Sequence, residues 1–567
     1  MMCTPSKPPP DPYDVAILGT NLTAASLAAI LGRHGLRVLM VGPGTHPRCS
    51  IGETATAYTS ELFRLLAERY QVPEFADLAG FDAITERVSR AVGVGRTLGF
   101  VYHGPGGAQD PEDVFQLASP KLVPVEATLY RQDIDAHLFY TAIRYGARAR
   151  QQTSVTDIRL GEDEVSISTS GGDEYRARFV VDTEAGDGRL ANLAGVVEEP
   201  TRLRARTRSL YTHMVGVRPF DEVCEPHSTA PVPWYHGTLY HLFDGGYLWT
   251  TPFGNHRGCA NLVCSVGLSL DAGKFEKTDD PEAEFRSLLA RIPAAAGLFE
   301  RAKAVQPWVS TGRQQHSVSR SIGHRWCVLG DAAGEVDPFL SRSLITSLEV
   351  VNALASRLIA AATDDDFAPS RFEYVERLQA QLIDINDQLV TMVHQSLAGR
   401  ALWKAVLRVW ELGSWLGTLQ LSAAVAQLRA TGRDSALREL ENAKHAGSPF
   451  PTHDGYNQLL RTTVELCDAV ARGGVHPPVA ADRLFEQLGD ADFAPAPLGF
   501  GDPSARFSNP GPLQLLRVFA WSKTAAPPEI GRVISQAMAA AAPKPADLRH
   551  AITLPKLPKL TLTDWRR

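Results

Sequence analysis

The first 41 residues alternate between apolar strand-like runs and a helical pattern. An apolar run at 14–18 ends at Gly19, apolar positions at helical spacing follow over 22–33, and a second apolar run covers 37–41. A short strand that ends in glycine and leads into a helix is typical of the opening of a dinucleotide-binding fold. We therefore predict a Rossmann-like α/β unit at this end of the chain.

Beyond this opening, the pattern changes twice. Residues 203–266 are rich in strand-forming and aromatic residues, with Tyr, Trp and His interleaved, and they predict a sheet that covers a substrate. An apolar run at 326–329 and a helical pattern at 345–361 return to α/β character. From residue 372 onward, long amphipathic helical patterns predominate, so we predict a helical C-terminal part.

Composition narrows the class of protein. The net charge of the 567 residues is -6 and no long basic run occurs, which argues against a nucleic-acid partner. The seven cysteines are scattered without a CxxC pair, so we expect buried thiols in a reducing compartment and no disulfide or metal site. The N-terminus lacks a signal-peptide core, and the apolar stretch at 24–31 is far shorter than the roughly 20 residues of a membrane span. These features predict a cytoplasmic protein without a membrane partner.

Five short motifs carry the candidate chemistry through their order and spacing. GTNLTA (19–24) lies at the first strand-to-helix turn, and GET (52–54) follows the second strand. Arg131 opens a predicted helix, GYLWTTPF (246–253) lies in the aromatic region, and GDAAGEVDP (330–338) follows a late strand. No single motif is specific, but the succession is.

This succession resembles the flavin-dependent halogenases, a branch of the aromatic-monooxygenase flavoproteins, over about residues 12–500. Within that family the likeness is greatest to the branch that chlorinates tetracycline-type polyketides. The resemblance implies FAD as cofactor, an aromatic polyketide-like small molecule as substrate and a separate flavin reductase as partner.

The resemblance also divides the chain. We predict a disordered N-terminal segment (1–12), an FAD-binding-type Rossmann-like domain in two pieces (13–200 and 310–365), a β-rich substrate-binding region (201–309) and a helical C-terminal region (366–567).

The predicted cofactor site draws on the motifs. Glycine at the first turn lets backbone N–H groups approach a pyrophosphate at a helix N-terminus, and the late Gly-Asp turn places a carboxylate against the ribityl and phosphate end of the flavin. The residues predicted to bind the cofactor are Gly19, Asn21, Thr23, Glu53, Arg131, Asp331, Gly334, Pro338 and Ser343.

This sequence departs from the family at the lysine that delivers halogen. That lysine lies shortly before a Gly-Phe-x-x-His stretch, and the matching residue here is Gly95. Arg96 follows, but a guanidinium is a poor nucleophile because it stays protonated. No lysine occurs between Lys7 and Lys121, so we predict that the chain does not halogenate.

The flavin-binding signature is altered as well. Asn21 replaces the second glycine of the first turn, Gly42 stands where a ribose-binding acid is expected, and Glu184 adds a carboxylate near the phosphates. Each lost contact weakens flavin binding by about 1–3 kcal/mol. Alternatively, Asn21 adopts the left-handed conformation that asparagine tolerates, and FAD stays bound. In addition, Ser343 replaces the glycine of a family Ser-x-Gly loop.

Four residues of the aromatic region are candidate catalytic residues. His213, His236 and His241 can act as acid or base if they face a substrate, although a lone histidine more often packs. Of the family's Trp-x-Trp-x-Ile-Pro motif, this chain keeps only Trp249 and Pro252. In the family, the motif prevents direct oxygenation of the substrate by the flavin. Its erosion favours direct oxygen transfer.

Two classes of function remain open, with true halogenation third. The intact Gly-Asp segment favours a flavin-dependent monooxygenase or other oxidoreductase, which we prefer. The altered first turn favours loss of FAD and redox-neutral cyclisation, isomerisation or dehydration in the old substrate cavity.

Overall fold

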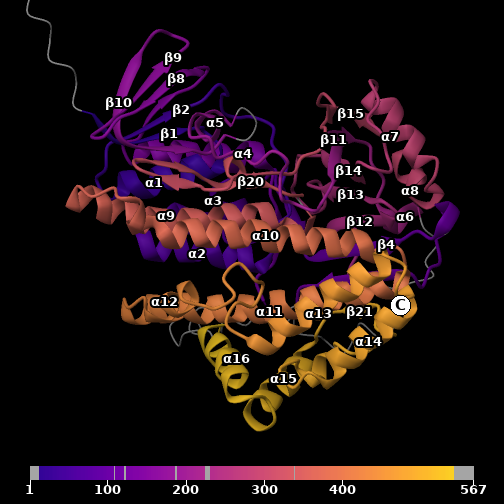
Figure 1. Cartoon of the computed structure of the whole chain (residues 1–567). Coiled ribbons are helices and arrows are strands. Elements are labelled where there is room, and N and C mark those ends of the chain that lie inside the picture. The colour runs from indigo at the N-terminus through magenta and orange to yellow at the C-terminus, as the bar shows by residue number, and fades with distance from the viewer. Residues whose placement is uncertain are drawn as a thin grey trace, which may run out of the picture.

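The computed structural model describes residues 12–107, 109–120, 123–184, 188–223, 230–337 and 339–541 (Figure 1). The predicted disordered segment therefore lies almost entirely outside the described residues, and so does Pro338.

One sheet is the predicted dinucleotide-binding sheet. Its strands lie in the order β18 (Ile322–Gly323), β19 (Trp326–Val328), β10 (Glu174–Asp182), β1 (Tyr13–Leu18), β2 (Val38–Val41) and β7 (Arg148–Arg150). The pairs from β19 to β7 are all parallel, and β8 (Val155–Leu160) and β9 (Val165–Thr169) extend β10 as antiparallel strands. This arrangement confirms the Rossmann-like fold.

Apolar helices cover this sheet because their inward positions are almost all small or aliphatic. All residues from Leu22 to Leu31 of α1 (Leu22–Arg33) are buried. This helix packs against α4 (Arg131–Arg144) and α9 (Arg342–Asp364). The segment Phe339–Asp364 is long and apolar enough to cross a membrane, but 67% of its most apolar window is buried inside the protein. Such burial is typical of a core helix.

The second sheet forms the other lobe (Figure 1). Its strands lie in the order β15 (Lys303–Ala304), β11 (Thr207–Val215), β14 (Cys264–Asp271), β13 (Gly246–Pro252), β12 (Gly237–Phe243), β4 (Thr97–Tyr102), β5 (Val114–Ala118) and β21 (Phe507–Ser508). The predicted segment boundaries do not separate the two sheets, because β4 and β5 come from the first predicted domain and β21 from the helical region. Hydrogen bonding between strands far apart in sequence decides their membership.

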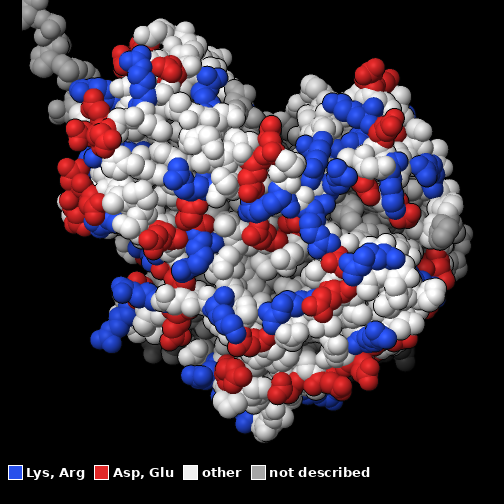
Figure 2. Space-filling model, viewed as in Figure 1, with Lys and Arg blue, Asp and Glu red and all other residues white. Residues whose placement is uncertain are grey.

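The helical C-terminal part packs under both lobes (Figure 1). The helix α10 (Glu373–Ser396) packs against α9, and α11 (Arg400–Thr431) packs against α2 (Ala57–Tyr70), α14 (Pro477–Asp490) and α16 (Pro528–Ala541). In α10, buried Leu382, Leu389 and Val393 recur at the spacing of one helix face. The viewed surface carries intermixed acidic and basic side chains (Figure 2).

Candidate functional site

The site is built on one face of the second sheet. Side chains alternate along β11, so Thr207, Tyr211 and His213 point to one face. Leu210 and Met214 point to the other face, where they join an apolar core. The first face therefore presents polar and aromatic groups toward the Rossmann-like lobe.

A thiol, an imidazole and a carboxylate lie in line on this face. The Nε2 atom of His213 is 2.7 Å from Oε1 of Glu53, and its Nδ1 atom is 3.7 Å from Sγ of Cys49. The side chains of His213 and Glu53 are each only 3% exposed, whereas Cys49 lies at the surface. A carboxylate can only accept, so Nε2 donates to Glu53 and Nδ1 faces the thiol. The expectation of buried thiols is wrong for Cys49.

Electrostatics tie this cluster to its neighbours. Burial alone would lower the pKa of His213, but hydrogen bonds to Cys49 and Glu53 and the charge of Glu53 raise it to about 10. Burial, then Cys49, Glu335 and Glu53, raise the pKa of Tyr211 to about 12. Tyr211 is therefore close enough to the thiol cluster, and to a second cluster that contains Glu335, to feel the charges of both.

The second cluster consists of three carboxyl groups, the half-buried Asp331 and Glu335 and the buried Asp337. Burial, and then the charges of Asp331 and Asp337, raise the pKa of Glu335 to about 8. Burial also raises the pKa of Asp331. The carboxylate of Asp337 accepts hydrogen bonds from the hydroxyls of Tyr247 and Ser269, each at 2.6 Å. At neutral pH, Glu335 is therefore protonated and can donate a proton, while Asp337 is fully engaged.

The first turn of the Rossmann-like lobe keeps the glycine at position 19 and has Asn21 in place of the second glycine of the dinucleotide-binding motif. Gly19 has φ +125°, and a Cβ there would lie 2.3 Å from Oγ1 of Thr183, so only glycine fits. Asn21 has φ −71° and not the left-handed conformation considered above; it caps α1 by accepting from the Ala24 N–H. The carboxylate of Glu184 lies over Gly19, with Oε1 3.1 Å from the position of that Cβ. Oε1 is buried without a hydrogen-bond partner among the described residues.

Two predicted cofactor-binding residues hold internal contacts. Arg131 is buried and donates to both carboxylate oxygens of Asp135 and to the carbonyl oxygen of Ile51. Thr23 packs against Gly330, which has φ +62°. Both residues therefore support the turns that flank the cofactor site.

The remaining two described residues lie on the Gly-Asp segment and at the start of the helix α9 that follows it. Gly334 belongs to β20 (Gly334–Glu335), where a Cβ would clash with Ile383 at 2.7 Å. Ser343 lies in α9 and its hydroxyl is 3.4 Å from Oδ1 of Asp331. The left-handed residue before this helix is Ser341, at φ +61°, and its hydroxyl is buried without a described partner.

Of the four candidate catalytic residues, the structure places two on the site face. Trp249 lies beside Tyr211, with ring centroids 6.5 Å apart, and His213 lies in the thiol cluster. His241 points to the opposite face, where it is 3.0 Å from Nε2 of His103, and burial holds its pKa well below the usual value. His236 lies against neighbouring Tyr235, with ring centroids 4.7 Å apart. The structure does not bring the three histidines together.

Cys49 and Glu335 were missed by sequence reasoning. Cys49 carries no local signal, because its partner His213 is 164 residues away. Glu335 lies inside the Gly-Asp segment, and no local pattern distinguishes it from the neighbouring Asp331 and Asp337.

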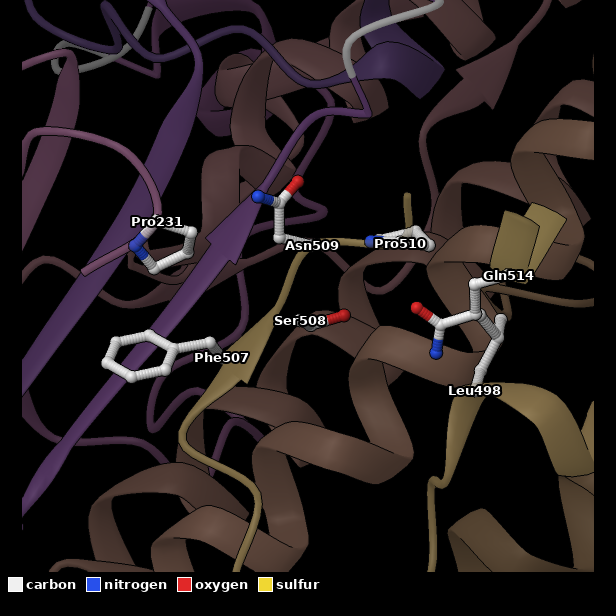
Figure 3. A pocket seen from close by; sticks show the side chains of 7 residues that line it. All are labelled: Pro231, Leu498, Phe507, Ser508, Asn509, Pro510 and Gln514. Carbon is white, nitrogen blue, oxygen red and sulfur yellow. The ribbon is translucent and has the colours of Figure 1, made fainter. Parts of the chain in front are cut away.

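Gly95, the predicted position of the missing lysine, and one surface hollow both lie apart from the two clusters. Gly95 lies on β3 (Gly93–Gly95), where a Cβ would be 3.1 Å from the carbonyl oxygen of Glu126 on the paired strand. A hollow of about 280 Å³ is lined by Pro231, Leu498, Phe507, Ser508, Asn509, Pro510 and Gln514 (Figure 3). It includes no residue of either cluster, so it is separate from the site.

Comparison with known proteins assigns the family. The chain is 38% identical to tetracycline 7-halogenase of Kitasatospora aureofaciens over 528 residues, covering 92% of this chain and 95% of that protein. It is 37% identical to the monodechloroaminopyrrolnitrin halogenase PrnC of Pseudomonas fluorescens, covering 91% of this chain and 93% of that protein. No family model matches the chain.

Solved structures agree with the sequence comparison. The halogenase PltM in complex with phloroglucinol and FAD has a TM-score of 0.84 and 31% identity, covering 88% of this chain and 99% of that one. A point mutant of PltM in complex with FAD has a TM-score of 0.85 with the same identity and coverage.

The residues of this chain fit FAD, with one unfavourable group. The glycine-only turn at Gly19 and the left-handed Gly330 turn leave room for a backbone approach to phosphate and flavin. Glu184 is the exception, because it adds a carboxylate beside the phosphate-binding turn. The similarity over almost the whole length and this glycine cradle show that the chain belongs to the flavin-dependent halogenase family, whose cofactor is FAD.

Proposed function

We propose that this chain is an FAD-dependent enzyme that transfers oxygen, and not halogen, to an aromatic polyketide-like small molecule. The observation that carries the proposal is Gly95 in place of the lysine, in a stretch of more than 100 residues without any lysine. A glycine offers no nitrogen that could hold an electrophilic halogen.

The names of relatives support an aromatic substrate. Tetracycline 7-halogenase names a polycyclic substrate, and PltM is solved with phloroglucinol. A more distant relative, 25% identical over 57% of this chain, is aklavinone 12-hydroxylase DnrF of Streptomyces peucetius. Hydroxylation of a small molecule therefore occurs among proteins similar to this one.

In the proposed reaction, FAD in its reduced form supplies oxygen transfer, and a separate flavin reductase supplies reduced flavin. The half-buried ring of Tyr211, which lies beside Trp249, offers an aromatic surface against which the substrate ring packs. Glu335 holds a proton at neutral pH that it can give to an oxygen of the substrate. Arg131 and Asp135 keep the supporting turn rigid through their buried ion pair. The free thiols of the described residues suit a reducing compartment, so the cytoplasm is the proposed location.

Halogenation is the second candidate. The observation in its favour is that the two full-length relatives named above are both halogenases. It requires a halogen carrier other than the missing lysine. The exposed thiol of Cys49 counts against it, because hypohalous acid oxidises thiols readily.

Product mass separates the candidates. The protein is incubated in air with FAD, a flavin reductase, NADH and either phloroglucinol or a tetracycline-type substrate, without halide, with chloride and with bromide. The proposal predicts a product heavier by one oxygen in all three, at the same rate. A product that appears only with halide and carries its isotope pattern would establish halogenation instead, and absence of saturable FAD binding would remove both candidates.

A further inference from the structure

The aligned side chains of Cys49, His213 and Glu53 have the relation of nucleophile, base and orienting acid. The imidazole contacts the thiol through one ring nitrogen and the carboxylate through the other, at 3.7 Å and 2.7 Å. The carboxylate orients the ring so that Nδ1 faces the thiol. Activated cysteines share this arrangement: a base within reach of the thiol and a third group that orients the base.

We propose that Cys49 is an activated nucleophile that forms a reversible covalent bond with a conjugated, electrophilic ring carbon, such as that of an enone. The inference is independent of the proposed function, because it requires neither FAD nor oxygen.

The imidazole and the carboxylate are buried, whereas the nucleophilic cysteine is exposed. His213 and Glu53 are withdrawn from solvent, so their hydrogen bond is not exchanged for bonds to water. Cys49 is exposed, so a molecule in solution can reach its sulfur. A thiol that served only packing would be buried, as Cys264, Cys327 and Cys467 are.

The surroundings favour a flat conjugated partner over a flexible acyl chain. The ring of His213 has Tyr130 at 6.2 Å and Phe253 at 6.0 Å, measured between centroids. Tyr211 completes the aromatic surroundings, since the charge of Cys49 acts on its hydroxyl. Aromatic side chains stack well on planar rings.

The step balances without an oxidant or reductant. The proton of the Cys49 thiol is held at Nδ1 of His213, whose raised pKa keeps the imidazole protonated, and the sulfur attacks the β-carbon of the enone as a thiolate. A C–S bond forms, and the C=C π electrons move to the carbonyl oxygen as an enolate. The proton on His213 then returns to the enolate, so the net change is addition of S–H across C=C. The reverse sequence releases the ring.

The described groups around this thiol are few. His213 faces the sulfur, Glu53 contacts the other nitrogen of His213, and Cys49 acts electrostatically on Tyr130 and Tyr211. The charge of Glu53 also acts on Arg131. Since Nδ1 of His213 faces the sulfur, Cys49 should be more reactive than a thiol that has no imidazole beside it.

The first test measures alkylation of the full-length protein by iodoacetamide under anaerobic conditions, from pH 5 to 10, with the modified cysteine identified by mass spectrometry. At pH 6.5, Cys49 should react at least about tenfold faster than Cys259, a half-buried thiol whose hydrogen-bond partners among the described residues are backbone atoms. His213→Gln should remove most of this advantage. Glu53→Gln keeps a hydrogen-bond acceptor for the buried imidazole and should cause a smaller loss of reactivity, so it serves if His213→Gln does not fold.

The second test uses cyclohex-2-enone as the conjugated probe and a benzoyl thioester of N-acetylcysteamine as the acyl probe. One enone adduct on Cys49 is expected in the wild type and in Cys259→Ser, and none in Cys49→Ser. Cys49 alkylation no faster than that of Cys259 at pH 6.5 would overturn the proposal. Benzoylation of Cys49 without any enone adduct would also overturn it, in favour of acyl transfer. Neither outcome affects the oxygen-transfer proposal, whose assay requires FAD.

Discussion

The position of Glu184 predicts that this chain binds FAD less tightly than its fold allows. Its carboxylate lies over Gly19, at the turn that approaches the cofactor pyrophosphate in dinucleotide-binding folds. The side chain is half-buried, and Oε1 has no described partner that would neutralise it. The change to test is Glu184→Gln, which keeps the shape of the side chain and removes its charge.

The magnitude follows from Coulomb's law. Two unit charges about 6 Å apart repel by about 3 kcal/mol at an effective dielectric constant of about 20. Partial exposure and about 0.15 M salt reduce this repulsion to about 1–2 kcal/mol. Glu184→Gln should therefore lower the Kd for FAD about five- to thirtyfold.

The assay is a titration with FAD, followed by flavin fluorescence, at about 0.05 M and about 0.5 M salt. The gain should be larger at low salt because salt screens the repulsion. Glu86→Gln is the matched control, since Glu86 is 75% exposed on α3 (Phe81–Arg87), and it should leave the Kd unchanged. An equal Kd for Glu184→Gln and wild type at both salt concentrations would refute the reasoning.

Three further predictions concern other residues. Gly95→Lys should give a halide-dependent product if the lysine is what the chain lacks. The substitution should also lower stability by about 1 kcal/mol, because the new Cβ meets the carbonyl oxygen of Glu126. Product mass measures the first effect and thermal melting the second, and a variant that binds FAD but gives no halogenated product would contradict the assigned position. Glu335 has a folded-state pKa of about 8, above its ordinary value, so its protonated form favours folding and stability falls as pH rises from about 4.5 to 8. In Glu335→Gln this fall should be smaller, as compared by chemical denaturation at pH 5 and pH 8, and an identical fall in both proteins would count against a protonated Glu335. Asn21→Ala should destabilise the protein by about 1 kcal/mol because the α1 cap is lost, and an unchanged denaturation midpoint would show that the cap contributes nothing.

The sequence by itself determined the local elements and the family. The apolar run before Gly19 and the small aliphatic positions of α1 predicted a strand, a turn and a buried helix, and these form as expected. Local patterns suffice there because strand and helix periodicity and glycine-only turns depend on neighbours in sequence. The sequence also shows directly that no lysine lies between Lys7 and Lys121, and the prediction that Gly95 stands at the position of the family's lysine rests on this.

Only the tertiary structure decided which chemistry-bearing residues meet. The strand β4 joins the second sheet by pairing with β12, and β5 joins it by pairing with β4, which no local pattern around residues 97–118 indicates. Sequence reasoning placed Glu53 with the cofactor and His213 with the substrate, whereas the fold joins the two side chains across 160 residues and adds Cys49. His241 lies on the opposite face from His213, because an odd or even position on a strand fixes the face, and pairing between distant strands fixes which face meets the site.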